Sequence, residues 1–544
     1  MPHPQAGQPV PKDLIPDVDA IIGAYTAVQP DPSEPQQRVS FGTSGHRGRS
    51  LDGAFNEAHV KAIAAAIAAV RAEDGITGPL VLAADTHALS QPAFQTTLGV
   101  LAAAGVTVHL QPDGRPVPTP VASHAILARN AGGLERADGI LLTPSHNPPD
   151  DGGLKYNPPH GGPAGSDLTR RIEAAANAWL EAGTDGIAML DPAAAREAAT
   201  THEVDLVGPY VDDLGSVLRL DAVAASGLSV GVDPLGGAAT WIWPLIAERY
   251  NLNLTVVQDR IDPSFAFMRL DGDGKIRMDC SSPHAMAGLV EHASRFDLAV
   301  GNDPDVDRHG IVAGGALMNP NAYLTVAADY LAGHRPDWPA QAGLAKTVVT
   351  TRLIDRVAAA HGRPLVETPV GFKWFVDGLT GGRIVFAAEE SAGATFNRLD
   401  GRVWTTDKDG ITAALLAAEI TAVTGTNPAE RYEALCRQHG RPYAARASAP
   451  ATLQERTALA QLDASRVTQT ALGGDPITAV RTHAPGNEAP IGGLKVETDA
   501  GWFAARPSGT EPIYKVYAES FRSDAHASTL LEEAQELVAR ATAG

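Results

Sequence analysis

Cysteines and long apolar runs are almost missing from this chain of 544 residues. The two cysteines, Cys280 and Cys436, stand far apart, so neither a disulfide framework nor a zinc spacing can form. Both are expected to be packing residues in a reducing cytoplasm. No segment approaches the ~18 apolar residues of a membrane helix. The N-terminus, MPHPQAGQPVPKDLIPD, lacks the apolar core of a signal peptide. We therefore expect a cytoplasmic protein that does not contact a membrane.

Basic residues are also in short supply. The chain has 43 Lys and Arg against 63 Asp and Glu, a formal net charge of −20. Such a charge argues against non-specific nucleic-acid binding and against docking on anionic membranes. It does not exclude a small anionic substrate, because a few local Arg and Lys side chains can dominate a cleft. The informative basic residues are therefore those that stand inside motifs.

Three segments share a β-α-β pattern, which begins with an apolar strand and continues through a helix to a second strand. The first strands are PLVLAAD (79–85), LSVGVD (228–233) and AKTVVTT (345–351). Units of about 30 residues with this pattern predict parallel strand pairs covered by helices. The pattern is lost after about residue 440, where short alternating strands (GWFAAR, IYKVYAES) precede a final helix.

The length predicts about three to five domains at roughly 100–200 residues each. We predict an N-terminal arm and helix (1–37), in which residues 1–12 are disordered or loosely docked. Three related α/β domains with mixed sheets are predicted to follow, and a smaller α+β domain to end the chain. Their predicted bounds are 38–205, 206–320, 321–440 and 441–544.

The stretch LTPSHNPPDDGG (142–153) follows the apolar run DGILL and contains too many prolines for a helix or a central strand. Ser145 thus lies just past the carboxyl end of a strand, where open α/β sheets bind their ligands. The prolines stiffen the turn. A serine that merely caps the turn is the alternative, but His146, Asn147 and Lys155 crowd the same loop.

A second polar loop, DPDVDR (303–308), follows the strand FDLAVGN. Asp303, Asp305 and Asp307 alternate along an extended chain, so their carboxylates point to one side. Oxygen ligands of this kind favour Mg²⁺, and the adjacent Arg308 suggests a phosphate that shares the metal. A solvated acidic loop is the alternative. The segment 271–282, DGDGKIRMDCSS, resembles a calcium loop but lacks its final Glu, so we predict a turn.

Two further loops contain groups that suit a sugar phosphate. In AAEESAGATF (387–396), carboxylates beside Ser391 can bind neighbouring sugar hydroxyls, or the segment can be a helix N-terminus. In RPSGTEPIYKV (506–516), a guanidinium, hydroxyls and a glycine can hold a phosphate, or the segment can be a surface turn. Two further segments, taken alone, are more typical of structural loops than of functional sites. They are FGTSGHRGRS (41–50), which contains His46 and Arg47, and TTDKDG (405–410), which contains Lys408.

Six motifs in this order resemble those of the α-D-phosphohexomutase superfamily: TSGHRG, TPSHNPPDDGGLKYNPPHGGPA, DPDVDRHG, TPVGFKWF, EESAGA and RPSGTEPIYKVY. More narrowly, the chain is similar to the bacterial glucose-phosphate-specific phosphoglucomutases, from about residue 38 to the C-terminus. The resemblance implies four domains around one deep central cleft, each giving one loop.

The resemblance also assigns roles. Ser145 is the phosphoserine, and Asp303, Asp305 and Asp307 hold Mg²⁺ together with a phosphate oxygen on Ser145. Lys155 is the general acid/base, with a pKa lowered by neighbouring cations. The other catalytic candidates are Arg47, His146 and Lys408. The implied substrate-binding residues are Arg308, Gly371, Lys373, Glu389, Ser391, Arg506, Ser508, Gly509 and Thr510.

The implied reaction interconverts glucose 1-phosphate and glucose 6-phosphate, with glucose 1,6-bisphosphate as intermediate and activator. Some relatives carry a histidine where this chain has Gly393, so a histidine cannot serve as acid or base at that position. The EES sequence of the sugar loop resembles that of the glucose-specific relatives. The alternatives are a phosphomannomutase or broader phosphohexomutase, a sugar-phosphate phosphatase, and a catalytically inactive protein that binds sugar phosphates. We expect small-molecule sugar phosphates as partners, no nucleic acid, and a monomer or homodimer.

Overall fold

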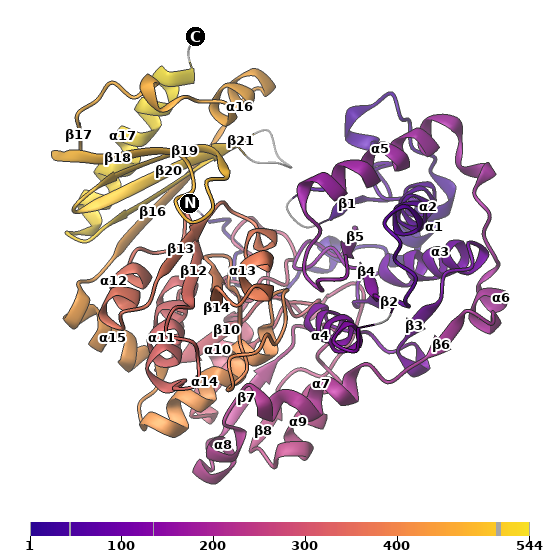
Figure 1. Cartoon of the computed structure of the whole chain (residues 1–544), viewed down its shortest axis with the longest axis horizontal. Coiled ribbons are helices and arrows are strands. Elements are labelled where there is room, and N and C mark those ends of the chain that lie inside the picture. Colours follow the sequence, from indigo (N-terminus) through magenta and orange to yellow (C-terminus); the bar gives the residue numbers. More distant parts are fainter. Residues whose placement is uncertain (1, 43–44, 134, 508–512, 543–544) are drawn as a thin grey trace. The chain divides into compact units, whose positions relative to one another are not determined.

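This computed structural model describes residues 2–42, 45–133, 135–507 and 513–542. The chain forms two compact units that do not follow the order of the sequence. The first unit consists of Met1–Asn319 and Ser391–Asn427, and the second of Pro320–Glu390 and Pro428–Gly544 (Figure 1). A segment of 391–427 thus returns to the first unit after the chain has entered the second.

The first sheet of the first unit has the strand order β1-β5-β4-β2-β3-β6. Strands β4, β2, β3 and β6 run parallel, whereas β5 is antiparallel to both β1 and β4. Its strands are β1 (His46–Arg49), β2 (Leu80–Ala84), β3 (Val108–Leu110), β4 (Asp138–Leu142), β5 (Asp151–Asn157) and β6 (Thr201–Glu203). Strands β2 and β4 are buried along their whole length, which explains their mainly apolar sequences. The charged exception, Asp138 at the start of β4, is paired with Arg71.

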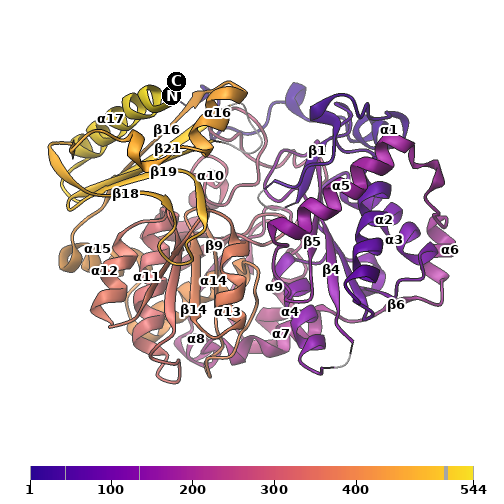
Figure 2. The same cartoon turned by 45° about the horizontal axis from the view of Figure 1, so that its top comes forward.

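Helices pack on this sheet and on one another. They are α1 (Val18–Ala27), α2 (Glu57–Glu73), α3 (Ser90–Ala103), α4 (Thr119–Asn130), α5 (Ser166–Ala182) and α6 (Pro192–Glu197). Helix α2 packs against both α3 and α5, and Figure 2 shows the three helices side by side. Helix α4 contacts β2 and β4. Because helices cover it, the sheet leaves mainly the ends of its strands to carry polar loops.

The second sheet of the first unit has the order β11-β10-β9-β7-β8. Its strands are β7 (Val230–Asp233), β8 (Leu254–Val256), β9 (Leu298–Gly301), β10 (Gly310–Ala313) and β11 (Ala316–Leu317). Strand β7 is parallel to β8 and β9, and β10 is antiparallel to β9. The accompanying helices are α7 (Val207–Asp213), α8 (Leu220–Ser226), α9 (Ile242–Tyr250) and α10 (Ala287–His292).

The returning segment of the first unit contains β15 (Gly393–Phe396) and α14 (Gly410–Thr424). Helix α14 contacts α8, β9 and β10. Most of its residues are buried, so it belongs to the core beside the second sheet. This packing carries the loop before α14, which includes Lys408, toward the end of β9.

In the second unit, β12 (Gly343–Thr347) is parallel to both β13 (Leu365–Thr368) and β14 (Ile384–Glu389). Its helices are α11 (Pro320–His334), α12 (Leu353–Ala360), α13 (Val376–Thr380) and α15 (Pro428–His439). The C-terminal sheet has the order β16-β21-β20-β19-β18-β17 and is antiparallel. Its elements are β16 (Tyr443–Pro450), β17 (Ala471–Leu472), β18 (Asp475–His483), β19 (Pro490–Thr498), β20 (Gly501–Pro507), β21 (Ile513–Ser520), α16 (Leu453–Ala460) and α17 (Asp524–Thr542).

The predicted fold class is confirmed. Each of the three β-α-β segments forms a parallel strand pair, and the C-terminal part is a separate α+β sheet. The predicted strands are trimmed at their ends, most clearly in AKTVVTT, where the strand ends at Thr347. The reason is local, because the Thr350 N–H turns back to the Thr347 carbonyl.

The N-terminal arm is more firmly held than predicted. The N–H of His3 donates to Gly272, that of Gly7 donates to Leu270, and Pro9 and Arg269 form a bridge. The calcium-like segment on which the arm docks is a turn, as predicted, closed by an Asp271 N–H to Lys275 carbonyl bond. The described residues of the arm, from Pro2 onward, are therefore docked rather than disordered.

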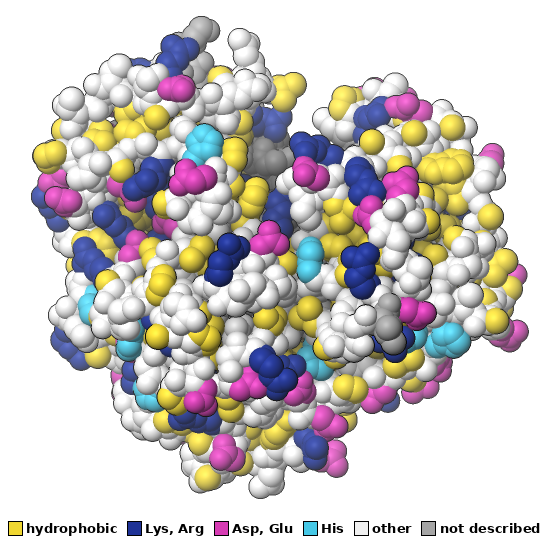
Figure 3. Space-filling view, in the orientation of Figure 1, with side chains coloured by type: hydrophobic (Ala, Val, Ile, Leu, Met, Phe, Trp, Pro, Cys, Tyr) yellow, Lys and Arg dark blue, Asp and Glu magenta, His cyan; other side chains and the backbone are white. Residues whose placement is uncertain are grey.

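Three other expectations concern composition. Both cysteines are buried and free, as expected for packing residues. None of the helices in the described ranges is long and apolar enough to cross a membrane. On the face drawn in Figure 3, the described Lys and Arg side chains are interspersed with Asp and Glu rather than gathered in one basic patch.

A buried ionic cluster joins the parallel strands of the second unit to its antiparallel sheet. Glu367 on β13 lies 2.8 Å from Lys495 on β19 and 3.1 Å from Lys346 on β12. Burial alone would raise the pKa of Glu367, but the two ammonium groups outweigh it and lower the pKa to about 2. The carboxylate is therefore ionised over almost the whole pH range.

Glu367→Gln is expected to lower the free energy of unfolding of the second unit by about 3 kcal/mol near neutral pH, because it removes the carboxylate that two buried ammonium groups share. Lys346 then keeps Asp355 as its ion-pair partner, and Lys495 keeps the more distant Glu497. The folded pKa is depressed from 4.5 to about 2. The wild-type advantage is therefore full above about pH 4.5 and is lost as the pH falls toward about 2. Urea denaturation of the wild type and of Glu367→Gln at a series of pH values measures this difference in the free energy of unfolding.

The matched control is Glu433→Gln, which removes one half of an exposed ion pair with Arg441 and should cost less than about 1 kcal/mol. A Glu367→Gln deficit that is no larger than the control's, or that does not shrink in acid, would contradict the role of the cluster.

Candidate active site

Ser145 lies three residues after β4, in a loop of the first unit. It is 1% exposed, and its backbone adopts a left-handed conformation with φ of 60°. This conformation costs a non-glycine residue roughly 1–2 kcal/mol, so the surrounding structure must hold it in place. The Ser145 N–H donates to Thr143 Oγ1 at 2.8 Å, and Ser145 Oγ donates to Asp303 Oδ2 at 2.8 Å.

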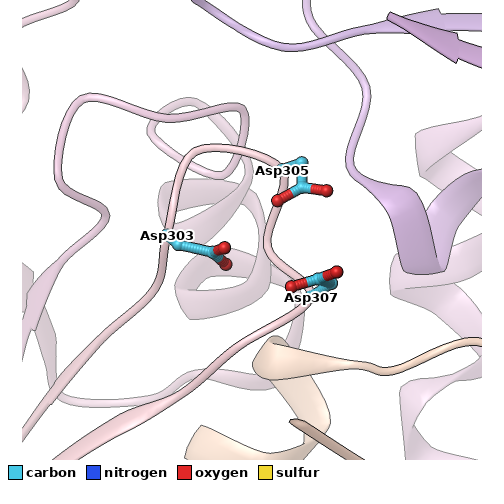
Figure 4. Close-up of side chains that lie close together, drawn as sticks. All are labelled: Asp303, Asp305 and Asp307. Carbon is cyan, nitrogen blue, oxygen red and sulfur yellow. The ribbon is translucent and has the colours of Figure 1, made fainter. Parts of the chain in front are cut away.

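Asp303 follows β9 by two residues and opens the second loop. Figure 4 shows Asp303, Asp305 and Asp307 on this one loop, with the Asp303 carboxylate pointing across it toward the other two. All three are buried, and one oxygen of each lies within 4.8 Å of the others. Val306 between them has a φ of 64°, a strained value for a β-branched residue. The alternative of a solvated acidic loop is wrong.

The three carboxylates fit a divalent cation. Burial and the charges of Asp305 and Asp307 raise the pKa of Asp303 well above its ordinary value. Asp305 Oδ1 and Asp307 Oδ1 are buried and have no hydrogen-bond partner among the described residues. Unpaired buried carboxylate oxygens are costly, and a cation between them removes both the missing contacts and the repulsion. Oxygen-only ligands select a hard metal ion.

Two lysines also reach the aspartates. Lys155, on β5, has its Nζ 2.5 Å from Asp305 Oδ2 and 3.2 Å from Asp307 Oδ2. Lys408 Nζ lies 3.1 Å from the same Asp307 oxygen. Burial opposes the charged lysine, but Asp305 and Asp307 outweigh it, so the pKa of Lys155 lies above its ordinary value. The lowered pKa expected from the sequence is therefore not produced by the protein groups alone.

Three more predicted residues lie in the same region of the first unit. Arg308 Nε is 4.0 Å from Asp303 Oδ2 and 3.9 Å from Asp307 Oδ1, and the half-buried Arg47 lies within electrostatic reach of Asp305 and Asp307. His146 Nδ1 lies 3.4 Å from Ser145 Oγ. Burial, together with Arg308, holds the pKa of His146 well below its ordinary value, so its ring is neutral near pH 7.

The sugar-loop candidates fall in both units. In the second unit, Glu389 ends β14 and accepts a hydrogen bond from the Gly371 N–H at 3.0 Å. Gly371 has a φ of 123°, which only glycine adopts without strain. Ser391 belongs to the first unit. Because β15 begins at Gly393, no helix starts in this segment, and the alternative of a helix N-terminus is wrong.

The phosphate-loop candidates are only partly described. Arg506 lies next to the end of β20 and is half-buried, while Ser508, Gly509 and Thr510 lie outside the described residues. Lys373 is half-buried, with its Nζ 5.7 Å from the centre of the Trp374 ring. Their predicted roles stay predictions.

Several residues that position the site were not found by the sequence analysis. Thr119 Oγ1 donates to Asp305 Oδ2 at 3.0 Å, and Asn157 Nδ2 donates to Asp407 Oδ2 at 2.9 Å. Asp409 caps α14 and accepts bonds from Tyr210 and Trp404, which anchors the loop of Lys408. The helix-capping position of Asp409 is readable from the sequence; the other contacts join residues too distant in the chain.

Four family models match the chain in order. They describe phosphoglucomutase/phosphomannomutase domain I (residues 38–182), domain II (208–315), domain III (319–439) and the C-terminal domain (454–537).

Named relatives match over most of the chain. A phosphoglucomutase from Komagataeibacter xylinus is 53% identical over 537 residues, which cover 98% of this chain and 97% of the relative. A phosphoglucosamine mutase from Chelativorans is 26% identical over 88% of this chain and 93% of its own length.

Two solved structures share the fold. A putative phosphomannomutase from Thermus thermophilus matches with a TM-score of 0.71 and 25% identity, over 94% of this chain and all of its own. The open form of a Paramecium phosphoglucomutase, parafusin, matches with a TM-score of 0.73 and 20% identity, over 94% and 96% of the two chains.

Proposed function

Because the chain belongs to the phosphoglucomutase/phosphomannomutase family, we propose that it is an isomerase that interconverts α-D-glucose 1-phosphate and glucose 6-phosphate. The observation that carries this proposal is the buried Ser145 hydroxyl, which is hydrogen-bonded to Asp303 and grouped with two further aspartates and several cations. The phosphoglucomutase name of the 53% identical relative and the EES sequence at Glu389 support glucose as the sugar.

In the proposed cycle, a phosphoryl group on Ser145 passes to the free hydroxyl of the sugar monophosphate and gives glucose 1,6-bisphosphate. The bisphosphate turns over, and its other phosphoryl group returns to Ser145. Each transfer forms one P–O bond and breaks another, so the enzyme ends as it began. The distal phosphate is proposed to bind Arg506, Ser508, Gly509 and Thr510, and the sugar hydroxyls to bind Glu389 and Ser391.

Proton movement is assigned to the groups beside Ser145. Lys155, which Asp305 and Asp307 keep protonated, can give a proton to the departing Ser145 oxygen and take it back when Ser145 attacks. The attacking sugar hydroxyl must lose its proton at the same time, and the neutral His146 is the candidate to accept it. Lys408 is paired with Asp307, so as a cation it could accept that proton only after giving up its own.

Charge explains the remaining groups. Three carboxylates and a phosphate of about −2 repel one another, and Arg47, Arg308, Lys155 and Lys408 offset part of that repulsion. We propose that Asp303, Asp305 and Asp307 hold Mg²⁺, which supplies Lewis-acid stabilisation of the transferring group. The protein's contribution is then mostly positioning and electrostatic stabilisation.

The test of the proposed function is a product assay with glucose 1-phosphate, Mg²⁺ and a priming amount of glucose 1,6-bisphosphate. A mutase gives glucose 6-phosphate and no free phosphate, whereas a phosphatase gives glucose and phosphate. Parallel reactions with mannose 1-phosphate and glucosamine 1-phosphate measure the sugar preference. Release of phosphate as the main reaction would overturn the proposal.

Lys155→Met is expected to lower kcat by at least about 100-fold, because the variant keeps the bulk of the side chain and loses its proton. The coupled glucose 6-phosphate assay measures it. Lys61→Met, which removes a lysine paired with Glu57 on α2, is the control and should keep the wild-type rate. A Lys155→Met enzyme with more than half the wild-type kcat would remove Lys155 from this role.

A further inference from the structure

A buried pair of charged side chains lies beneath the Ser145 loop in the first unit. Asp85 directly follows β2, His87 comes two residues later, and both side chains are fully buried. His87 Nδ1 lies 2.8 Å from Asp85 Oδ2, and His87 Nε2 lies 3.1 Å from the Asn147 carbonyl oxygen. The pair therefore reaches the loop two residues after Ser145.

The hydrogen bonds define the protonation of the pair. Neither a carboxylate nor a carbonyl oxygen can donate, so both ring nitrogens of His87 must carry a proton. Besides the bond from the His87 ring, the Asp85 carboxylate accepts three hydrogen bonds. They come from the backbone N–H of His87 at 2.9 Å, from Ser90 Oγ at 2.5 Å and from Thr143 Oγ1 at 2.6 Å. With that many donors around it, Asp85 is a carboxylate and His87 is an imidazolium.

The surroundings agree with this assignment. Burial opposes both charges, but each partner outweighs it, so the pKa of Asp85 is lowered and the pKa of His87 is raised. Asp151 adds a second negative charge near His87, and the Phe265 ring lies 5.0 Å from the imidazole, where it keeps water away.

The pair also contacts the loop on the N-terminal side of Ser145, through Thr143. Thr143 Oγ1 uses its proton to bond Asp85, so its lone pairs are left to accept the Ser145 N–H at 2.8 Å. The loop is thus held at Thr143 on one side of Ser145 and at Asn147 on the other. Between these two points stands the serine in its left-handed conformation.

We propose that Asp85 and His87 are positioning residues that form an ion-pair clamp, which holds the Ser145 loop in the conformation that aims its hydroxyl at the aspartates. This inference rests on the proposed function, because it assigns the clamp to phosphoryl transfer at Ser145. Its members do not touch the substrate. Their effect passes through Thr143 and Asn147 to the backbone on both sides of the serine.

The kinetic test uses Thr143→Val, which keeps the shape of the side chain and removes the hydroxyl that links Asp85 to Ser145. We expect kcat to fall about 10- to 100-fold with little change in KM, because small displacements of a reacting group cost rates of this size. Thr143→Ser restores the hydroxyl and should recover most of kcat. Loss in both variants, or in neither, would overturn the clamp.

The matched control is Thr325→Val on α11 of the second unit. Thr325 is also fully buried, and its hydroxyl donates to the Asn321 carbonyl at 2.8 Å. A comparable loss of buried hydroxyl bonding there should leave kcat unchanged. A fall in kcat equal to that of Thr143→Val would mean that general destabilisation, rather than the clamp, explains the result.

A second measurement does not depend on activity. In protein labelled with ¹⁵N-histidine and held at about pH 8, well above the ordinary histidine pKa of ~6.5, His87 should show two protonated ring nitrogens. Its resonance is identified by its loss in His87→Gln or, if that variant does not fold, by its contacts with Phe265. A neutral ring would overturn the clamp. If the wild-type enzyme shows no mutase activity, the proposed function fails, whereas the spectrum still decides the ion pair.

Discussion

Ser145→Ala is expected to lose phosphoglucomutase turnover by a factor on the order of 10⁴ or more, because it removes the hydroxyl that accepts and returns the phosphoryl group in the proposed cycle. The hydroxyl is fully buried and bonded to Asp303, so alanine removes one hydrogen bond without opening the loop. The coupled assay measures turnover. Mass spectrometry after incubation with glucose 1,6-bisphosphate measures phosphorylation, which should appear on the wild type and be missing from the variant.

Ser226→Ala is the control for this experiment. The Ser226 hydroxyl donates to the Val223 carbonyl at the end of α8, outside the Ser145 loop, and its loss should change neither turnover nor phosphorylation. A Ser145→Ala enzyme that still converts glucose 1-phosphate at a tenth of the wild-type rate would show that the serine is not the nucleophile.

Removal of divalent cations with a chelator is expected to lower activity by about 10³-fold, and added Mg²⁺ should restore it. The reason is that a metal ion contributes several kcal/mol of transition-state stabilisation, and each ~1.4 kcal/mol is tenfold in rate. Asp307→Asn is expected to cause a loss of similar size, which Mg²⁺ does not repair, and to weaken Mg²⁺ binding in calorimetry.

Asp273→Asn is the matched control, since Asp273 lies in the calcium-like turn and bonds Arg277. That variant should bind Mg²⁺ as the wild type does and keep its activity. Full activity after chelation, or undiminished Mg²⁺ binding by Asp307→Asn, would exclude the three aspartates as the metal site.

Much of the fold and part of the site were predictable from the sequence. The grouping of Asp303, Asp305 and Asp307 after an apolar strand is a local pattern, and the structure places their carboxylates together. The predicted extended chain is wrong, because a turn closed by the Val306 N–H to Asp303 carbonyl bond brings them together. The position of Ser145 just past the end of β4 was also predictable, because an apolar run followed by prolines marks the end of a strand. The β-α-β segments were visible because helix and strand periodicities act over a few residues.

Other features were out of reach of the sequence. Asp85 and Thr143 are separated by 58 residues and meet only because β2 and β4 are neighbours in the sheet. Lys408 reaches Asp307 across about a hundred residues, because the chain returns from the second unit to the first. Whether the pKa of Lys155 rises or falls depends on the balance between burial and two nearby carboxylates. This balance is set by distances in the folded protein.

The amino-acid sequence by itself determined the family, the types of secondary structure and the chemical nature of each loop, because these depend on short-range patterns and on which side chains are present. Only the tertiary structure decided which charges meet, which protons are held and what supports the serine. Electrostatic energies in a buried site depend on separations of a few ångströms, and residues far apart in the chain acquire such separations only when the strands pair and the helices pack.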